Sequence, residues 1–206
     1  MAPRARAPLC IIGDGATSKG DFYEALNVAD VWQLPLVVLI CNNQWAISVR
    51  RSAQSAAQTL AQKAISAGVP GEQVDGNDVI GVHACVTRAL ARARAGGGTS
   101  LIEAVTYRLS DHTTADDARR YRHDVEVSVH WHGEPVALLR QYLVSQGVWN
   151  RDHEEQTLAR AAAEIDRVAE VYLATPPQPI SAMFRDHSWH DLRKSNAFII
   201  PPARRR

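Results

Sequence analysis

Residues 11–48 read I-I-G-D-G-A-T-S-K-G-D-F-Y-E-A-L-N-V-A-D-V-W-Q-L-P-L-V-V-L-I-C-N-N-Q-W-A-I-S, and this stretch decides the fold. Two short apolar runs, residues 9–12 and residues 36–41, each stop at turn residues, which are Gly-Asp-Gly at 13–15 and Asn-Asn at 42–43. Apolar runs of this length that are bounded by turn residues predict buried strands.

The segment between the two runs predicts a crossover helix. Phe22, Ala25, Leu26 and Ala29 fall at helical spacing, and Pro35 ends the helical run. A strand, a helix and a second strand form a parallel pair with a right-handed crossover. We therefore expect both polar turns at the same edge of the sheet, outside the carboxyl ends of the strands, where open α/β sheets bind ligands.

The two turns carry complementary chemistry. Asp14 offers a carboxylate, Asn43 offers an amide oxygen, and the turn after Asn43 can aim a backbone carbonyl inward. Hard oxygen donors of this kind suit Mg²⁺, which also accepts phosphate oxygens as ligands. Gly13 and Gly15 place no side chain beside Asp14, so a diphosphate can approach the backbone N–H groups at the start of the helix.

Two commoner phosphate-binding patterns do not fit this stretch. The dinucleotide fingerprint needs a third glycine three residues after Gly15, and Ser18 stands there. A P-loop needs Lys and Ser or Thr after its last glycine, whereas Asp21 and Phe22 follow Gly20. The sequence therefore disfavours a generic nucleotide-binding domain.

Gly-Asp-Gly followed, after residues 16–41, by Asn-Asn resembles the thiamine-diphosphate motif. The words GDGATSKGDF, EALN, LP and NNQWAIS, and later VDGNDV and LIEAVTYR, closely resemble the alpha subunits of the two-subunit 2-oxo acid dehydrogenases, with pyruvate dehydrogenase the nearest look-alike. The plain alternative is a pair of turns that merely connect strands and helices, and the intact flanking words disfavour it. The fold expected from pattern and resemblance together is one α/β domain with a doubly wound parallel sheet and a C-terminal helical extension.

The resemblance implies a cofactor site, an activity and two partners. Mg²⁺ would be held by Asp14, Asn43 and the carbonyl of Trp45. The cofactor-binding residues that it implies are Gly13, Asp14, Gly15, Ala16, Asn43, Trp45 and His112. The implied reaction decarboxylates pyruvate with thiamine diphosphate and passes the acyl group to a lipoyl-bearing acyltransferase. In this family the glutamate that activates the aminopyrimidine ring comes from a beta subunit, which implies an interface site in a heterotetramer.

Residues 107–122 form a polar stretch without a clean period, at the same expected edge of the sheet as the two turns. Long loops without periodicity inside a compact domain are usually functional or disordered. Arginines alternate here with aspartates, so ion pairs are expected to hold the loop. By resemblance it is the active-site loop, in which His112 is the catalytic histidine and Thr113 stands where relatives carry a phosphorylated serine. An ordinary surface histidine is the alternative for His112.

Other functions of the same family, and one of a different class, stay open. Branched-chain 2-oxo acid and acetoin dehydrogenase alpha subunits share the motifs. The family has a long region before its Gly-Asp-Gly, whereas the first strand starts here about eight residues after Met1. We therefore expect the C-terminal part of an alpha subunit, or a non-catalytic remnant that binds a partner.

Composition excludes several classes of protein. The 206 residues carry a formal net charge of +1, which gives no electrostatic basis for binding nucleic acid or a membrane surface. No apolar run approaches the ~20 residues of a membrane span, and the expected compartment is the cytoplasm. Cys10, Cys41 and Cys85 are odd in number and far apart, so they are expected to be small core residues.

The rest of the chain predicts further helices and strands. Strands are expected at residues 72–75 and 100–106. Helices are expected at residues 53–67, from Asp78 as N-cap to about residue 95, at 135–147 and at 151–174. The predicted organisation is a diphosphate-binding α/β domain over residues 1–124 and a helical extension over residues 125–206, whose aromatic tail, with Trp189 and Phe198, is expected to dock on a neighbouring surface.

Overall fold

The computed structural model describes residues 6–180 and residue 182. The aromatic tail with Trp189 and Phe198 lies outside the described residues. The chain forms two compact units, one ending at Trp149 and one beginning at Asn150, and each is described by itself. The boundary expected at residue 124 stays a prediction.

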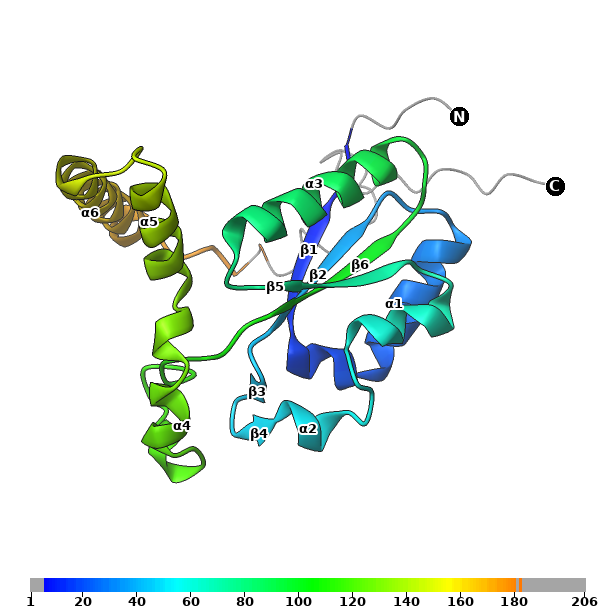
Figure 1. Cartoon of the computed structure of the whole chain (residues 1–206). Helices are drawn as coiled ribbons and strands as arrows, with labels where there is room; N and C mark the ends of the chain where they lie inside the picture. Colours follow the sequence, from blue (N-terminus) through cyan, green and yellow to red (C-terminus); the bar gives the residue numbers. More distant parts are fainter. Residues whose placement is uncertain (1–5, 181, 183–206) are drawn as a thin grey trace. The chain divides into compact units, whose positions relative to one another are not determined.

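A four-stranded parallel sheet forms the centre of the first unit (Figure 1). Its strand order is β1 (Leu9–Gly13), β2 (Val37–Asn42), β6 (Ser100–Val105) and β5 (Gly71–Asp75). Gly13 pairs with Cys41, and Val105 pairs with both Asn42 and Asp75. The last residues of all four strands therefore meet at one edge of the sheet, which is the edge that the two turns predict.

Helices cover both faces of this sheet, which confirms the doubly wound α/β fold. Helix α1 (Gly20–Val31) and the 3-10 helix η2 (Ala61–Ala67) pack on one face, around Leu26, Ile40 and Leu101. Helix α3 (Val79–Arg94) packs on the other face, around Leu39 and Ile102. Figure 1 shows α1 and α3 on opposite sides of the strands.

Strand β1 lies at the edge of the described sheet, and this position changes the environment of its side chains. Ile11 is 61% exposed, and Cys10 is exposed as well. Cys41 and Cys85 are half-buried. The expectation of a core position is therefore wrong for Cys10, which is exposed on the edge strand of the described sheet.

The helix predicted over residues 53–67 is wrong. Helix α2 covers only Arg51–Gln54, an irregular segment follows, and the chain then enters η2. Side chains occupy the backbone donors that a continuous helix would need: the N–H of Ala61 donates to Glu103 at 3.0 Å, and the N–H of Ala57 lies 3.4 Å from the Ser55 hydroxyl. Lys63 is also drawn inward, where its Nζ donates to the Thr17 carbonyl at 2.7 Å.

The other predicted helices of this unit agree with the structure. Asp78 caps α3 and accepts a hydrogen bond from the N–H of Ile80 at 3.0 Å. After β6 the chain forms η3 (Ala118–Arg120), α4 (Asp124–Ser128), η4 (Trp131–Gly133) and α5 (Pro135–Ser145). A two-stranded hairpin that the sequence did not predict, β3 (Trp45–Ala46) with β4 (Val49–Arg50), follows the Asn-Asn turn.

The second unit contains helix α6 (Arg151–Ala174), as predicted. The Asn150 side chain caps it by accepting a hydrogen bond from the N–H of His153 at 3.0 Å. Its apolar side chains, including Leu158, Ile165 and Tyr172, are exposed within this unit. Across the described part of the chain, no helix combines the length and the apolar character that crossing a membrane requires.

Candidate functional site

Asp14 follows β1 directly and begins the short 3-10 helix η1 (Asp14–Ser18). Its side chain is buried, with 4% of the residue exposed. Two hydrogen bonds hold the backbone of this turn. The Thr17 hydroxyl donates to the Asp14 carbonyl at 2.7 Å, and the Lys63 ammonium donates to the Thr17 carbonyl. A buried lysine and a buried threonine therefore hold the backbone that presents the carboxylate.

The two glycines beside Asp14 differ in what surrounds them. A Cβ at Gly15 would lie 2.6 Å from the Cβ of Ala46, so the close approach of the β3–β4 hairpin requires glycine there. A Cβ at Gly13 would meet nothing within 4 Å. Apart from the chain neighbours Ile12 and Asp14, the space that a side chain at Gly13 would fill is therefore open, so a ligand group can approach the backbone at this point.

The Asn-Asn turn presents oxygen atoms at the end of the neighbouring strand. The side-chain oxygen of Asn43 accepts a hydrogen bond from the Trp45 N–H at 3.1 Å, and that of Asn42 accepts one from the Gln44 N–H at 3.2 Å. Gln44 has a φ of 70°, in the left-handed region, which sharpens the turn. The Asn42 amide in turn donates to the buried carboxylate of Glu103 at 2.6 Å, so the centre of the sheet orients the turn.

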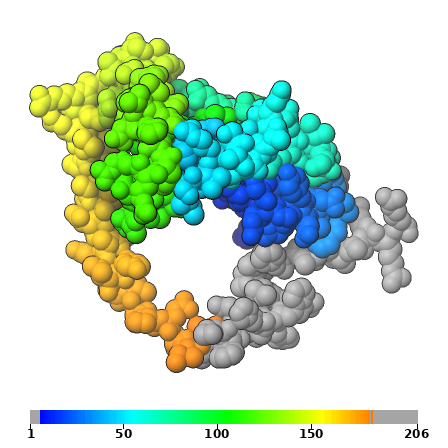
Figure 2. All heavy atoms as spheres, turned by 90° about the horizontal axis from the view of Figure 1, so that it is seen from below, coloured from blue at the N-terminus to red at the C-terminus, as the bar shows by residue number. Residues whose placement is uncertain are grey.

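The two turns lie against each other at the carboxyl edge of the sheet. The register of β1 with β2 aligns Gly13 with Cys41, so Asp14 and Asn43 each lie just beyond a paired position. Gln54, which follows the hairpin, reaches back to within 3.5 Å of the Asp14 carboxylate. Figure 2 looks onto this edge, where residues 14–35 in blue, the hairpin in cyan and the segment after β6 in green form adjoining surface.

Burial governs the electrostatics of the first turn. Loss of hydration raises the pKa of Asp14 above its ordinary 3.8. Hydrogen bonds from the backbone N–H groups of Asp14 and Gly15 and the nearby charge of Arg108 act in the opposite direction, with a smaller effect. These opposing effects offset only part of the cost of burying the Asp14 charge. A bound cation would stabilise the charged form further, so the carboxylate is suited to be an oxygen ligand for Mg²⁺.

The loop after β6 begins at the Asn-Asn turn, because the Arg108 N–H donates to the Asn43 carbonyl at 3.1 Å. Further along, the His112 N–H donates to the Asp116 carboxylate at 2.9 Å, and the His112 side chain is exposed. The structure therefore brings the start of this loop to the two turns and holds His112 by its backbone. The catalytic role of His112 stays a prediction.

The expected ion pairs of this loop form only in part. Arg119 pairs with Asp117 at 2.8 Å on the surface. Arg122 is buried and donates instead to backbone carbonyls, among them those of Arg108 and of Ser110, the latter at 3.1 Å. Buried arginines thus bind the loop through carbonyls, which alternating charge in a sequence does not reveal.

A model of the family described as "Dehydrogenase E1 component" matches residues 2–180 of the chain. The chain belongs to this family. It is 48% identical over 176 residues to the 3-methyl-2-oxobutanoate dehydrogenase subunit alpha of Mycobacterium tuberculosis (strain ATCC 25618 / H37Rv), which covers 85% of the chain and 48% of that relative. It is 44% identical over 172 residues to the pyruvate dehydrogenase E1 component subunit alpha of Staphylococcus epidermidis (strain ATCC 12228 / FDA PCI 1200), covering 83% of the chain and 46% of that relative.

Membership of the E1 family confirms the resemblance on which the cofactor expectation rests. The chain spans about half the length of the curated relatives that it matches. E1 components of 2-oxo acid dehydrogenases depend on thiamine diphosphate, and the first turn fits its diphosphate because of the open space beside Gly13. The donors present, a carboxylate at Asp14 and an amide oxygen at Asn43, also fit Mg²⁺. The individual site residues stay predictions.

Arg108, a residue that the sequence analysis did not assign to the site, lies against the Asn-Asn turn, because its N–H donates to the Asn43 carbonyl. It is 9% exposed, and its Nη2 donates to the Ile47 carbonyl in the hairpin and to the Tyr121 hydroxyl, both at 2.7 Å. The sequence did contain a signal for Arg108, because this residue comes shortly after the end of strand β6, as Asp14 comes after the end of strand β1. Lys63 and Gln54 gave no such signal, since the sequence predicted them on one long helix.

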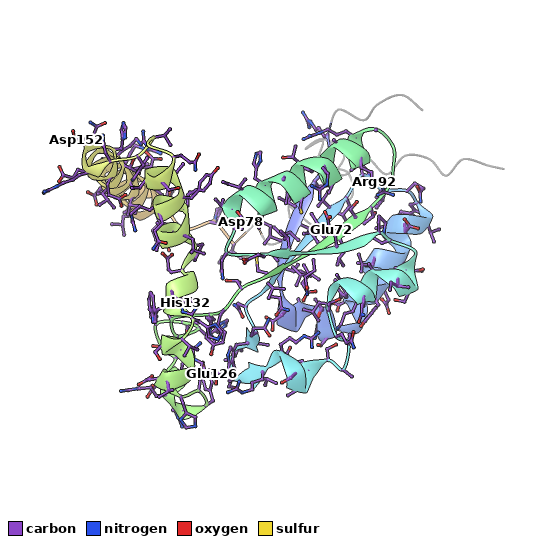
Figure 3. The ribbon with its side chains drawn as sticks, viewed as in Figure 1. Glu72, Asp78, Arg92, Glu126, His132 and Asp152 are labelled. Carbon is purple, nitrogen blue, oxygen red and sulfur yellow. The ribbon has the colours of Figure 1, made fainter. Side chains whose placement is uncertain are left out.

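A cavity of about 600 Å³ adjoins the hairpin. Trp45, Arg50, Tyr107, Glu126 and His130 are among the residues that line it. The Tyr107 hydroxyl donates to Glu126 at 2.8 Å and its ring stacks on His130 at 3.7 Å. Glu126, labelled in Figure 3, also accepts from Arg50, so this cluster ties α4 to the hairpin beside the site.

Proposed function

We propose that the chain is the alpha subunit of a thiamine-diphosphate-dependent 2-oxo acid dehydrogenase that decarboxylates pyruvate. One observation carries the proposal: the buried carboxylate of Asp14 and the oxygen-rich turn at Asn43 end neighbouring strands, and the space beside Gly13 is open. Mg²⁺ keeps an octahedral set of oxygen ligands, to which a diphosphate contributes. Membership of the E1 family supports the identity of the cofactor.

Each residue of the two turns has a proposed task. Asp14, Asn43 and the Trp45 carbonyl would hold Mg²⁺, and the backbone of Gly13, Gly15 and Ala16 would lie against the diphosphate. When bound, thiamine diphosphate supplies the carbanion chemistry that makes decarboxylation of a 2-oxo acid possible. The protein fixes the diphosphate end, and the hydrogen bonds of Thr17, Lys63 and Glu103 hold the turns that do so.

His112 is proposed to contact the diphosphate end of the site and to move a proton during acyl transfer. An imidazole side chain can both donate and accept a proton, which suits it to this step. The proposal is supported by the loop itself, in which the His112 N–H donates to Asp116 and the Arg108 N–H donates to the Asn43 carbonyl. Its exposed side chain is free to approach a lipoyl group that arrives from outside.

The proposed partners are a beta subunit and a lipoyl-bearing acyltransferase. The two turns are proposed to bind the diphosphate and the metal. The glutamate that activates the aminopyrimidine ring is expected to come from the beta subunit. The acyl group is proposed to pass to the lipoyl group of the acyltransferase. Thr113, next to His112 in an exposed part of the loop, is a candidate for regulatory phosphorylation.

A branched-chain 2-oxo acid is the second candidate substrate. The observation in its favour is the identity of 48% with the 3-methyl-2-oxobutanoate dehydrogenase subunit, against 44% with the pyruvate dehydrogenase subunit. The turns at Asp14 and Asn43 bind the cofactor in either case, so they do not discriminate between the two substrates.

Co-expression of the chain with candidate beta subunits tests the proposal. The purified complex should release CO₂ from pyruvate, or from 3-methyl-2-oxobutanoate, in the presence of Mg²⁺, thiamine diphosphate and an artificial electron acceptor. The ratio of kcat/KM for the two acids decides the substrate. Asp14→Ala should weaken Mg²⁺-dependent cofactor binding by about 10²-fold or more, since a charged ligand is lost, and Asp14→Glu should retain part of it. Unchanged binding in Asp14→Ala and in Asn43→Ala would refute the site.

A further inference from the structure

Arg108 is a buried cation whose hydrogen bonding is incomplete. Its Nη2 has two acceptors, the Ile47 carbonyl and the Tyr121 hydroxyl. Its Nε and Nη1 are buried, and neither has a hydrogen-bond partner in the described part of the chain. Arg122, the other buried arginine of the loop, differs because its Nη1 and Nη2 both donate to backbone carbonyls.

The burial and the permanent charge of Arg108 together predict the kind of group that lies beside its guanidinium. A guanidinium group stays protonated at every physiological pH, so Arg108 cannot relieve its burial by losing a proton. A buried N–H donor without an acceptor is costly, and such groups are rare in folded proteins. An acceptor carrying negative charge is therefore expected beside Nε and Nη1.

The position of Arg108 identifies the acceptor. Its backbone N–H donates to the Asn43 carbonyl, and its side chain is bonded to Ile47 in the hairpin whose Ala46 abuts Gly15. The guanidinium is thus held beside the hairpin that follows the Asn-Asn turn, and it is near enough to the first turn for its charge to lower the pKa of Asp14. Asp116, a nearby carboxylate, accepts from Tyr121 and from His112 and makes no hydrogen bond to Nε or Nη1 of Arg108, so an anion bound at the sheet edge can supply the missing acceptor.

We propose that Arg108 donates hydrogen bonds from Nε and Nη1 to the diphosphate of the bound cofactor and is a binding residue of the site. This inference rests on the proposed function, because it takes thiamine diphosphate as the ligand of the two turns. In this role Arg108 would add its positive charge to that of the metal, so both would offset the negative charge of the diphosphate.

Calorimetry on the complex with the beta subunit tests this role with two ligands, Mg²⁺–thiamine diphosphate and Mg²⁺–pyrophosphate. Arg108→Gln should weaken both by about 10²-fold, as expected when one partner of a buried charged hydrogen bond is truncated. Arg108→Lys, which keeps the charge and most of the packing, should weaken both by about tenfold. Arg119→Gln is the matched control in the same loop, and because its ion pair is exposed, both affinities should stay within about threefold.

The possible results distinguish a failure of the proposed function from a failure of the role proposed for Arg108. If the wild-type complex binds neither ligand, the proposed function fails. If the wild type binds both and Arg108→Lys binds both equally well, the arginine does not contact the diphosphate. Weaker binding of thiamine diphosphate with unchanged binding of pyrophosphate would also overturn the inference. Thermal unfolding and size-exclusion chromatography show whether Arg108→Gln folds and assembles, and Arg108→Lys gives the answer if it does not.

Discussion

Asp14 and Glu103 are both buried acidic side chains on the parallel sheet or at its edge, but their surroundings differ. Glu103 accepts hydrogen bonds from the Asn42 amide at 2.6 Å, from the Ala61 N–H at 3.0 Å and from the Gln73 amide at 3.0 Å. The side-chain contact of Asp14 with Gln54 is long, at 3.5 Å. The Glu103 carboxylate is a structural group that joins β2, β5, β6 and η2, whereas the Asp14 carboxylate is bonded mainly within its own turn, by the N–H groups of Asp14 and Gly15.

Glu103→Gln should lower the free energy of unfolding by about 2 kcal/mol. The substitution puts an amide NH₂ among groups that are themselves donors, and a buried donor without an acceptor costs about 1–3 kcal/mol. Urea denaturation measures the loss. Glu72→Gln, at an exposed ion pair with Arg88, is the control and should cost less than about 1 kcal/mol (Figure 3). Equal effects of the two substitutions would show that the Glu103 network does not stabilise the sheet.

At the scale of elements, the loop over residues 107–122 and the β3–β4 hairpin act together, because Arg108 and Trp45 make contacts that join them. The sequence predicted a functional loop at the correct edge of the sheet, since polar residues follow the apolar strand β6. It did not predict the hairpin. Two-residue strands are too short for a period, and the left-handed φ angles fall on Gln44 and Ile47, which carry no glycine signal.

His112→Ala should separate cofactor binding from acyl transfer. The metal ligands are on other elements, so Mg²⁺–thiamine diphosphate binding should stay within a few fold. Transfer to a lipoyl domain should fall by about 10²-fold or more, the usual effect of losing a general acid–base group. Decarboxylation with an artificial electron acceptor should suffer less. His132→Ala, an exposed histidine outside the loop, is the control, and an equally small effect of both substitutions would make His112 an ordinary surface residue.

The contact between α4 and the hairpin should depend on pH. The hydrogen bond from Arg50 lowers the pKa of Glu126 below its usual 4.5. The contribution of a carboxyl with a lowered pKa is present above pH 4.5 and is lost as the pH falls through the lowered value. Arg50 is 48% exposed, so solvent screening limits this contribution to less than about 1 kcal/mol.

Denaturation of Glu126→Gln beside the wild type checks this dependence. The variant should be less stable by up to about 1 kcal/mol at pH 7, and the difference should shrink as the pH falls below 4.5, where the wild-type carboxyl takes up its proton. A stability difference that is the same at pH 7 and at pH 3 would show that packing, and not the charge of Glu126, makes the contact.

At the scale of the whole molecule, the sequence predicted the parallel sheet with helices on both faces, because Ile12, Leu26 and Ile40 follow strand and helix periods. It could not predict that η2 would replace a long helix. That outcome depends on Glu103, which is distant in sequence and accepts a hydrogen bond from the N–H of Ala61. The positions of Asp14 and Asn43 at the sheet edge were predictable from the ends of the strands. The interest of Arg108 became visible only in the structure, which shows that two of its buried nitrogen atoms have no acceptor.

The exposed apolar surface of the first unit bears on how the chain works. Ile11 on β1 is 61% exposed, and Val31 and Trp32 at the end of α1 are 70% and 54% exposed. Ile11 pairs with Leu39, which faces α3, whereas Val31 and Trp32 lie at the end of α1 on the opposite face, so exposed apolar side chains occur on both sides of the edge strand.

The isolated chain should bind Mg²⁺–thiamine diphosphate weakly or not at all, and the complex with its beta subunit should bind it tightly. The two turns contribute contacts to the diphosphate and to the metal, whereas the aminopyrimidine ring is expected to need the partner, so much of the binding free energy is missing from the chain alone. Calorimetry on the chain before and after addition of the beta subunit measures the difference, which should be at least about 10²-fold in Kd, or about 2.7 kcal/mol. Inorganic pyrophosphate with Mg²⁺ is the control ligand, and its affinity should change far less on assembly because its contacts come from Asp14, Asn43 and Arg108. Tight, saturable binding of thiamine diphosphate by the isolated chain would contradict the half-site and would place the whole cofactor on the alpha chain.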